Sequence, residues 1–190
     1  MADTEDAIRG FLSGDEEAFG RIVRQWEKKI YNLAWRMLNN REDAQDVVQE
    51  TFLSVFRSIR NLRTPGSFPT WLFQIALNHC RSRWRSRTSD VSMDDTAIDQ
   101  AGDREYLLPT SSSSGKIPDP LETVDLIQKA LAGIREDHRT AIVLKEYMGL
   151  SLDELSKVME CPLSTAKSRL YLGLREVQRN LKRMGIRIED

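Results

Sequence analysis

The stretch "SLDELSKVMECPLSTAKSRLYLGLREVQRNLKR", Ser151 to Arg183, predicts two helices joined by a short turn. Ser151 followed three residues later by Glu154 is a capping box, which marks the start of a helix. The residues "ECP" form the turn, and Pro162 stands where a new helix accepts proline, at its first positions. The apolar residues expected to pack across the turn are Leu152, Leu155 and Met159 on one side and Leu163, Ala166 and Leu170 on the other.

Two helices at a steep angle across a short turn form a helix-turn-helix, whose second helix enters the major groove of DNA. That second helix begins with side chains small enough to approach base edges and polar enough to bind them. Its N-terminus also favours a phosphate. The candidate DNA contacts are Ser164, Thr165, Lys167, Ser168 and Arg169. The alternative is an ordinary helical hairpin with a solvated cationic face.

The composition describes a folded protein with an uneven distribution of charge. Hydrophobic residues make up 40% and charged residues 30% of the 190 residues, which fits a helix-rich globular chain. Residues 1–87 carry a net charge of +3 (14 Lys+Arg against 11 Asp+Glu), and residues 126–190 also carry +3 (12 against 9). Residues 88–125 carry −7 (2 against 9). Because the formal net charge of the chain is only −1, a nucleic-acid surface must be sought locally.

The pattern of apolar residues predicts an all-α protein with two small helical domains. Three helices are expected between Glu16 and about Arg87, the third from Phe68 or Thr70 to about Arg85, and four more from Leu121 onward. Between them the helical period disappears into Asp, Ser, Thr, Gly and Pro, a composition typical of a linker. We therefore expect domains at 1–87 and 121–190, joined by a flexible acidic linker at 88–120.

Several classes of protein are disfavoured by what the sequence contains. Cys80 and Cys161 are far apart and lack metal-ligand spacing, so we expect two reduced cysteines that serve as packing residues. The N-terminus is acidic and without the apolar run of a signal peptide, and no apolar stretch reaches the ~20 residues of a membrane span. The sequence predicts a cytoplasmic protein with no metal or other cofactor.

An acidic stripe is predicted on the helix that contains "REDAQDVVQETFLSVFRSI", Arg41 to Ile59. Asp43, Asp46 and Glu50 fall at i, i+3 and i+7, on one face that we expect opposite the apolar face. Carboxylates grouped in this way could form a di-metal or acid–base site. However, the two histidines of the chain, at 79 and 138, lack the Glu-x-x-His spacing of such sites. A solvated face and a docking face are the other two interpretations.

A basic helix end follows in "FPTWLFQIALNHCRSRWR", Phe68 to Arg85. Leu72, Ile75, Ala76 and Leu77 are expected to pack inward, and Arg81, Arg83, Arg85 and Arg87 surround the end of the helix. Arginines at a helix C-terminus stabilise the helix dipole, which is sufficient reason for their presence. Their density beside Trp71 and Asn78 instead favours a surface that holds single-stranded DNA. Trp84 suits either a core or a surface position.

These three motifs together resemble bacterial sigma factors of the extracytoplasmic-function type, the promoter-specificity subunits of RNA polymerase. Arg41–Ile59 is similar to the region 2 helix of that family, Phe68–Arg85 to its promoter-melting part, and Leu152–Leu181 to region 4. The resemblance covers nearly the whole chain outside the linker, in the family's order. It implies that residues 1–87 are sigma region 2 and that residues 121–190 are sigma region 4.

The resemblance also implies a role for each set of candidate residues. The acidic helix would dock on the coiled-coil clamp of the large subunit of core RNA polymerase, through Asp43, Asp46, Gln49 and Glu50. The loop 61–70 would capture a base flipped from the downstream promoter element, and the basic helix would hold the melted strand. The residues assigned to this strand are Asn61, Arg63, Thr70, Trp71, Asn78, Arg81 and Arg85.

In region 4, the upstream promoter element would be bound by the five candidate contacts of the second helix. We assign Lys167 to the groove and Arg169 mainly to phosphate, because residues two apart lie about 200° apart around a helix. The linker would pass through polymerase toward its active site, where a −7 segment can mimic a polyanion; a passive tether is the alternative. The family usually has glycine near Glu160 and Ser164, so a left-handed turn at these positions would carry strain here.

The predicted function is that of a dissociable transcription-initiation factor and not of an enzyme. It would bind core RNA polymerase, direct it to a two-element promoter and help to open the DNA, and an anti-sigma factor would hold it inactive. A helix-turn-helix regulator that acts on polymerase from outside is the nearest alternative. An enzyme built on a helical bundle is the alternative from another class, and the shortage of histidines argues against it.

Overall fold

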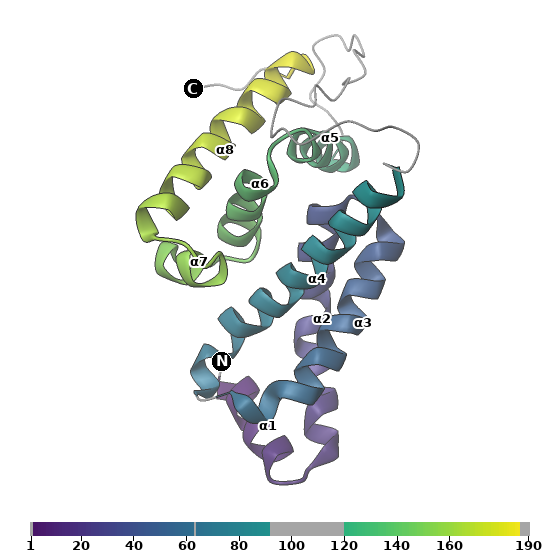
Figure 1. Cartoon of the computed structure of the whole chain (residues 1–190), viewed down its shortest axis with the longest axis vertical. Helices are drawn as coiled ribbons and strands as arrows, with labels where there is room; N and C mark the ends of the chain where they lie inside the picture. The colour runs from purple at the N-terminus through teal and green to yellow at the C-terminus, as the bar shows by residue number, and fades with distance from the viewer. Residues whose placement is uncertain (1, 63, 92–119, 187–190) are drawn as a thin grey trace. The chain divides into compact units, whose positions relative to one another are not determined.

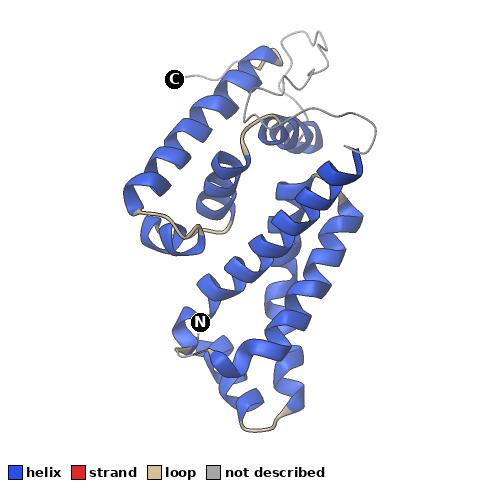
Figure 2. Cartoon of the chain, viewed as in Figure 1, coloured by secondary structure: helices blue, strands red, loops and turns tan. Residues whose placement is uncertain are grey.

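The structure, a computed structural model, describes residues 2–62, 64–91 and 120–186. Within these ranges every regular element is a helix, as Figure 2 shows. The chain divides into two compact units, an N-terminal unit built on α1–α4 and a C-terminal unit built on α5–α8 (Figure 1). The predicted all-α class is confirmed. In the described residues no helix is both long and apolar enough to cross a membrane.

The N-terminal unit contains α1 (Ala2–Leu12), α2 (Glu16–Leu38), α3 (Arg41–Ser58) and α4 (Phe68–Val91). Short 3₁₀ turns at Ile59–Asn61 and Pro65–Ser67 connect the last two. Helix α2 packs along α3 and against α1. The three helices expected in this region are present, although α4 continues beyond the expected end near Arg85. Helix α1 was not predicted from the sequence.

The starts of α2 and α3 are set by side-chain caps. The Asp15 carboxylate accepts a hydrogen bond from the Ala18 amide (3.2 Å), and the Asn40 side chain accepts one from the Asp43 amide (2.9 Å). The hydrogen bond that Arg21 donates to Asp15 (2.9 Å) lowers the pKa of this carboxyl group. Because these caps satisfy amide groups that have no partner within the helix, they fix where the two helices begin.

The core of the N-terminal unit forms where α2 meets α3 and α4. Trp26 is buried on α2, and its ring meets the rings of Phe68 and Phe73 edge-on, with centroids 5.8 and 5.9 Å apart. Ala76 and Leu77 are buried as expected, whereas Ile75 is only half-buried. The largest fully buried side chains of this unit are Ile8, Ile22, Ile30, Leu33, Met37, Ile59, Phe68, Leu72 and Leu77.

The C-terminal unit contains α5 (Pro120–Ala132), α6 (Glu136–Ile142), a π-helical turn (Val143–Tyr147), α7 (Leu152–Val158) and α8 (Leu163–Arg183). Helix α8 packs against α6 and α5. The contact with α6 is close at Gly173, where an added Cβ would lie 3.0 Å from the Cβ and the carbonyl oxygen of His138. A side chain at 173 would therefore keep the two helices apart.

Two buried polar side chains bind the carbonyl groups at the end of α5. Arg139 of α6 donates to the carbonyls of Ala132 (2.8 Å) and Ile134 (3.1 Å). Asn180 of α8 donates to the carbonyl of Ala130 (3.1 Å). Since the last carbonyls of a helix have no partner within the helix, these bonds stabilise the C-terminus of α5 and connect it to α6 and α8.

Candidate nucleic-acid and partner interfaces

The predicted helix-turn-helix is formed by α7 and α8. The Ser151 amide donates to Glu154 Oε2 (2.8 Å) and the Glu154 amide donates to Ser151 Oγ (3.2 Å), so the expected capping box is present. The turn contains Glu160 with a φ of 50°, the left-handed conformation that we expected to require strain in a residue other than glycine. Pro162 is the N-cap residue of α8.

The packing across this turn follows the sequence prediction with one correction. Leu155, Met159, Ala166 and Leu170 are all buried, and Leu152 is half-buried. Leu163 was expected to pack inward, but it is 37% exposed. Leu163 is the first residue of α8, directly after the N-cap, where no preceding helical turn covers it.

The candidate DNA contacts of α8 divide between an outward face and a face turned toward α6. Ser164, Lys167 and Ser168 are exposed, whereas Thr165 is half-buried. The guanidinium group of Arg169 lies 2.8 Å from the carboxylate of Asp137 on α6, so this cation has an internal partner. Asp137 was not predicted as a partner, because the pair depends on how α6 packs against α8.

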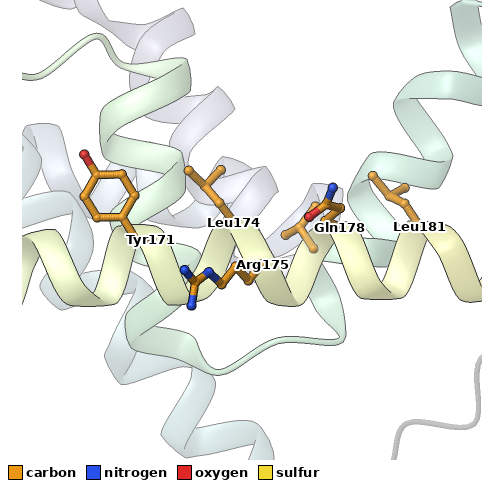
Figure 3. A pocket seen from close by; sticks show the side chains of 6 residues that line it. Tyr171, Leu174, Arg175, Gln178 and Leu181 are labelled. Carbon is orange, nitrogen blue, oxygen red and sulfur yellow. The ribbon is translucent and has the colours of Figure 1, made fainter. Parts of the chain in front are cut away.

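Tyr171 extends the outward face of α8 and was not predicted. It is 59% exposed and lies seven residues after Ser164 and four after Lys167, on the same side of the helix. Beyond it, the outer surface of α8 forms a shallow hollow of ≈ 390 Å³ (Figure 3). The side chains that line this hollow are Tyr171, Leu174, Arg175, Val177, Gln178 and Leu181.

The acidic stripe of α3 forms an ionic cluster with α4. Arg83 Nη2 lies 2.9 Å from Glu50 Oε1 and 3.0 Å from Asp46 Oδ2, and Arg83 Nη1 lies 3.8 Å from Asp43 Oδ1. His79 Nδ1 lies 3.2 Å from Glu50 Oε2. The hydrogen bond to Glu50 raises the pKa of the Arg83 guanidinium above its ordinary value, so this cation stays charged.

The exposure of the stripe differs from the prediction that it lies opposite the apolar face. The side chain of Asp43 is only 16% exposed, whereas those of Asp46 and Glu50 are 48% and 41% exposed. Gln49 is exposed, and Phe52 is buried. The stripe therefore borders the packed face of α3, where Arg83 and His79 of α4 contact it.

The role of Arg83 in this cluster was missed among the arginines of α4. Ala76, Cys80 and Arg83 occur at i, i+4 and i+7, and the first two are buried. This spacing puts Arg83 on the packed side of the helix, and it is the signal that could have separated Arg83 from Arg81 and Arg85.

The predicted single-strand contacts lie on α4 and on the turns that precede it. Asn61, Asn78 and Arg85 are exposed, and Thr70 and Arg81 are half-buried. Trp71 and Trp84 are half-buried as well. Arg63 lies outside the described residues. The exposed positions among them therefore present solvent-accessible amide and guanidinium groups.

Comparison with known protein families gives two matches along the chain. The family model of sigma-70 region 2 matches residues 22–89, and that of sigma-70 region 4 matches residues 125–177. An RNA polymerase sigma-H factor of Pseudomonas aeruginosa is 31% identical, over 89% of this chain and 89% of its own. The ECF RNA polymerase sigma factor SigW of Bacillus subtilis is 31% identical, over 92% of this chain and 95% of its own. The chain belongs to the ECF group of sigma factors.

Solved structures agree with this family in their fold. The sigma factor RpoE, solved in complex with the anti-sigma factor NepR from Bartonella quintana, has a TM-score of 0.67 at 22% identity, over 86% of this chain and 96% of its own. CnrH, solved with the cytosolic domain of CnrY, has a TM-score of 0.70 at 21% identity, over 95% and 97%. The family matches, and not these structures, show that the chain is a transcription-initiation factor and not an enzyme, with core RNA polymerase and promoter DNA as its partners.

Proposed function

We propose that the exposed side of α3 is the surface by which this sigma factor docks on the coiled-coil clamp of core RNA polymerase. The residues proposed for the contact are Asp43, Asp46, Gln49 and Glu50. The observation that carries the proposal is the half-exposed pair of carboxylates at Asp46 and Glu50, next to an exposed Gln49. A carboxylate-rich face of this kind is complementary to a partner surface that presents lysine or arginine.

The second proposed surface binds the melted strand of the downstream promoter element. It comprises Asn61, Arg63, Thr70, Trp71, Asn78, Arg81 and Arg85. Support comes from the exposed Asn78 and Arg85 on the same helix as Trp71, since single strands are held by cations together with aromatic and polar groups. Arg83 has no part in this surface, because it is engaged by α3.

The third proposed surface is the outward face of α8, which would enter the major groove of the upstream promoter element. Its contacts are Ser164, Thr165, Lys167, Ser168 and Arg169. The exposure of Ser164, Lys167 and Ser168 supports direct contact with bases. The internal pair with Asp137 supports a lesser, phosphate-directed role for Arg169.

The proposed domain boundaries are 1–87 for region 2, 88–120 for the acidic linker and 121–190 for region 4. Most of the linker, residues 92–119, lies outside the described residues. Its −7 charge between 88 and 125 supports a path through the polyanion-binding channels of polymerase. The sigma factor acts in the cytoplasm, where core polymerase is, and an anti-sigma factor restrains it, as in the NepR complex of its structural relative.

The test of this function is reconstitution with purified core polymerase. We expect the chain to co-elute with core enzyme in gel filtration and to support run-off transcription from a two-element promoter in the absence of any other sigma factor. A protein that binds the promoter without core enzyme, or that changes transcription only when another sigma factor is present, would be a regulator and would contradict the proposal.

Within α3, the docking surface is tested by the single variants Gln49→Ala and Asp46→Asn. Reversal of charge at both Asp46 and Glu50 would place two new cations next to Arg83, and the repulsion would disturb the fold as well as the docking surface. Gln49 forms no part of the cluster, so a loss of co-elution in Gln49→Ala reports on docking alone. Undiminished co-elution of both variants would remove this face from the contact.

A further inference from the structure

The ionic cluster between α3 and α4 connects the proposed docking surface to a single guanidinium group. Arg83 Nη2 binds one oxygen of Asp46 and one oxygen of Glu50, at 3.0 and 2.9 Å. The second oxygen of Glu50 faces His79 Nδ1 at 3.2 Å, and the other ring nitrogen of His79 lies 3.0 Å from Ser54 Oγ. Two side chains of α4 thus fix the position of the Glu50 carboxylate.

The cluster leaves the carboxylates accessible from outside. Asp46 and Glu50 keep 48% and 41% of their side-chain surface exposed, although Arg83 holds one oxygen of each. The guanidinium group is the less exposed member, with 32% of the Arg83 side chain accessible. A basic partner can therefore reach both carboxylates without displacing Arg83.

We propose that Arg83 is a positioning residue of the docking surface, which holds Asp46 and Glu50 in the arrangement that a basic surface of core RNA polymerase binds. This inference rests on the proposed function of α3. A flexible side chain that must be ordered on binding reduces affinity by roughly 2- to 12-fold. Arg83 holds two such side chains in place in the free protein, so their ordering does not reduce the affinity for polymerase.

The charge of Arg83 alone predicts the opposite effect on binding. Removal of the one guanidinium from among three carboxylates makes the surface more acidic, which would strengthen its attraction to a basic partner. Arg83 could instead compete with polymerase for the two carboxylates. In that case, its removal would also lower the Kd. The sign of the change in affinity therefore separates positioning from both alternatives.

The experiment measures the Kd of the full chain for core polymerase by fluorescence anisotropy, at two salt concentrations. We expect Arg83→Gln to raise the Kd about tenfold, mainly through faster dissociation, since two carboxylates lose their fixed positions. Arg83→Lys keeps the charge but not the planar fork and should lie between Arg83→Gln and wild type. Arg24→Gln removes an exposed cation from α2 of the same unit and should leave the Kd within about twofold of wild type.

A matched variant separates positioning from a general loss of stability. Ile22→Val shortens a fully buried side chain of α2 away from the cluster and lowers the Tm of the same unit. We expect Ile22→Val to bind polymerase as wild type does, even where its Tm falls as far as that of Arg83→Gln. A common loss of affinity in the two variants would overturn the positioning role.

The remaining outcomes distinguish the inference from the function on which it rests. Unchanged or tighter binding by Arg83→Gln, while Gln49→Ala still weakens binding, overturns the role of Arg83 and leaves the docking surface in place. Unchanged binding by Arg83→Gln, Gln49→Ala and Asp46→Asn together overturns the docking surface itself. Weaker binding by all three, with Arg24→Gln and Ile22→Val unaffected, is the result that the proposal requires.

Discussion

In each unit, one arginine of a proposed DNA-binding helix pairs with one or more carboxylates of a neighbouring helix, but the contact between the two helices differs. In the N-terminal unit, Arg83 of α4 reaches α3 through a long side chain and meets Asp46 and Glu50. In the C-terminal unit, Arg169 of α8 pairs with Asp137 beside a backbone contact at Gly173.

This difference indicates which change each unit tolerates. The interface of α3 and α4 depends on the balance of charges in its ionic cluster. An interface of close backbones accepts a change of charge but not an added methyl group, because a packed interior transmits strain instead of absorbing it. The comparison also shows that a run of basic residues does not itself identify the cations that face DNA.

Gly173→Ala should have the largest effect on stability. The added methyl group would lie 3.0 Å from the His138 backbone oxygen and 3.0 Å from Ile142 Cδ1. Overpacking typically costs ~1–3 kcal/mol, which exceeds the ~1 kcal/mol that alanine gains in a helix. We expect a net loss of up to about 2 kcal/mol in the free energy of unfolding, measured by hydrogen exchange of amides in α6 and α8.

Gly20→Ala in α2 is the control for this variant. The nearest atom outside the local helix backbone belongs to the flexible guanidinium of Arg24, at 3.4 Å from the added Cβ. Here we expect a gain of about 0.5–1 kcal/mol from helix propensity. Equal changes in the two variants would contradict the close contact of α8 with α6 at Gly173.

Asp137→Asn tests the ion pair between Asp137 and Arg169 in the C-terminal unit. The pair with Arg169 is partly exposed, with 35% and 26% of the two side chains accessible, so the free energy of unfolding should fall by less than ~1 kcal/mol. A released Arg169 should reach a DNA phosphate and steepen the salt dependence of holoenzyme binding to promoter DNA by about one unit of slope.

Asp153→Asn is the control, because it removes an exposed carboxylate from α7 without releasing an arginine. It should leave the slope unchanged. The same change of slope in both variants would mean that only the total charge matters and that Arg169 is not held back by Asp137.

Glu160→Gly should have the smallest effect, and a favourable one. Glu160 has a φ of 50°, a conformation that costs residues other than glycine about 1 kcal/mol. Part of this gain is lost because glycine has more freedom in the unfolded chain, so we expect a stabilisation of about 0.5 kcal/mol in urea unfolding. Asn39→Gly, at a φ of 51°, should gain less because asparagine tolerates this conformation; a larger gain at 39 would contradict the explanation.

Most of the fold could be predicted from the sequence because it depends on local patterns. The helical period of apolar residues indicated the helices of both units, and the Ser151–Glu154 capping box fixed the start of α7. Helix α1 was missed because its buried apolar residues Ala7, Ile8 and Phe11 span little more than one helical turn, before the first clear apolar run. Leu163 was assigned to the interior because periodicity does not show where a helix loses the cover of a preceding turn.

The candidate site could be predicted only as far as one helix determines it. The exposed positions of α8 and the acidic row of α3 follow from spacing within a helix. The internal partners of Arg83 and Arg169 do not, because they depend on packing between helices that are distant in sequence. Function came from the resemblance of three motifs to one family, which the family matches confirm.

The division of cations on α8 is tested by transcription with holoenzyme that carries Lys167→Ala or Arg169→Ala, across single-base variants of the upstream promoter element at two salt concentrations. Lys167 is exposed on the outward face, so its loss should cost ~1–3 kcal/mol and relax specificity at one base position. Arg169 is engaged by Asp137, so its loss should weaken all sequences alike and by less. Equal, sequence-independent losses from both variants would contradict the division between outward and inward cations, and no loss from either would remove α8 from promoter recognition.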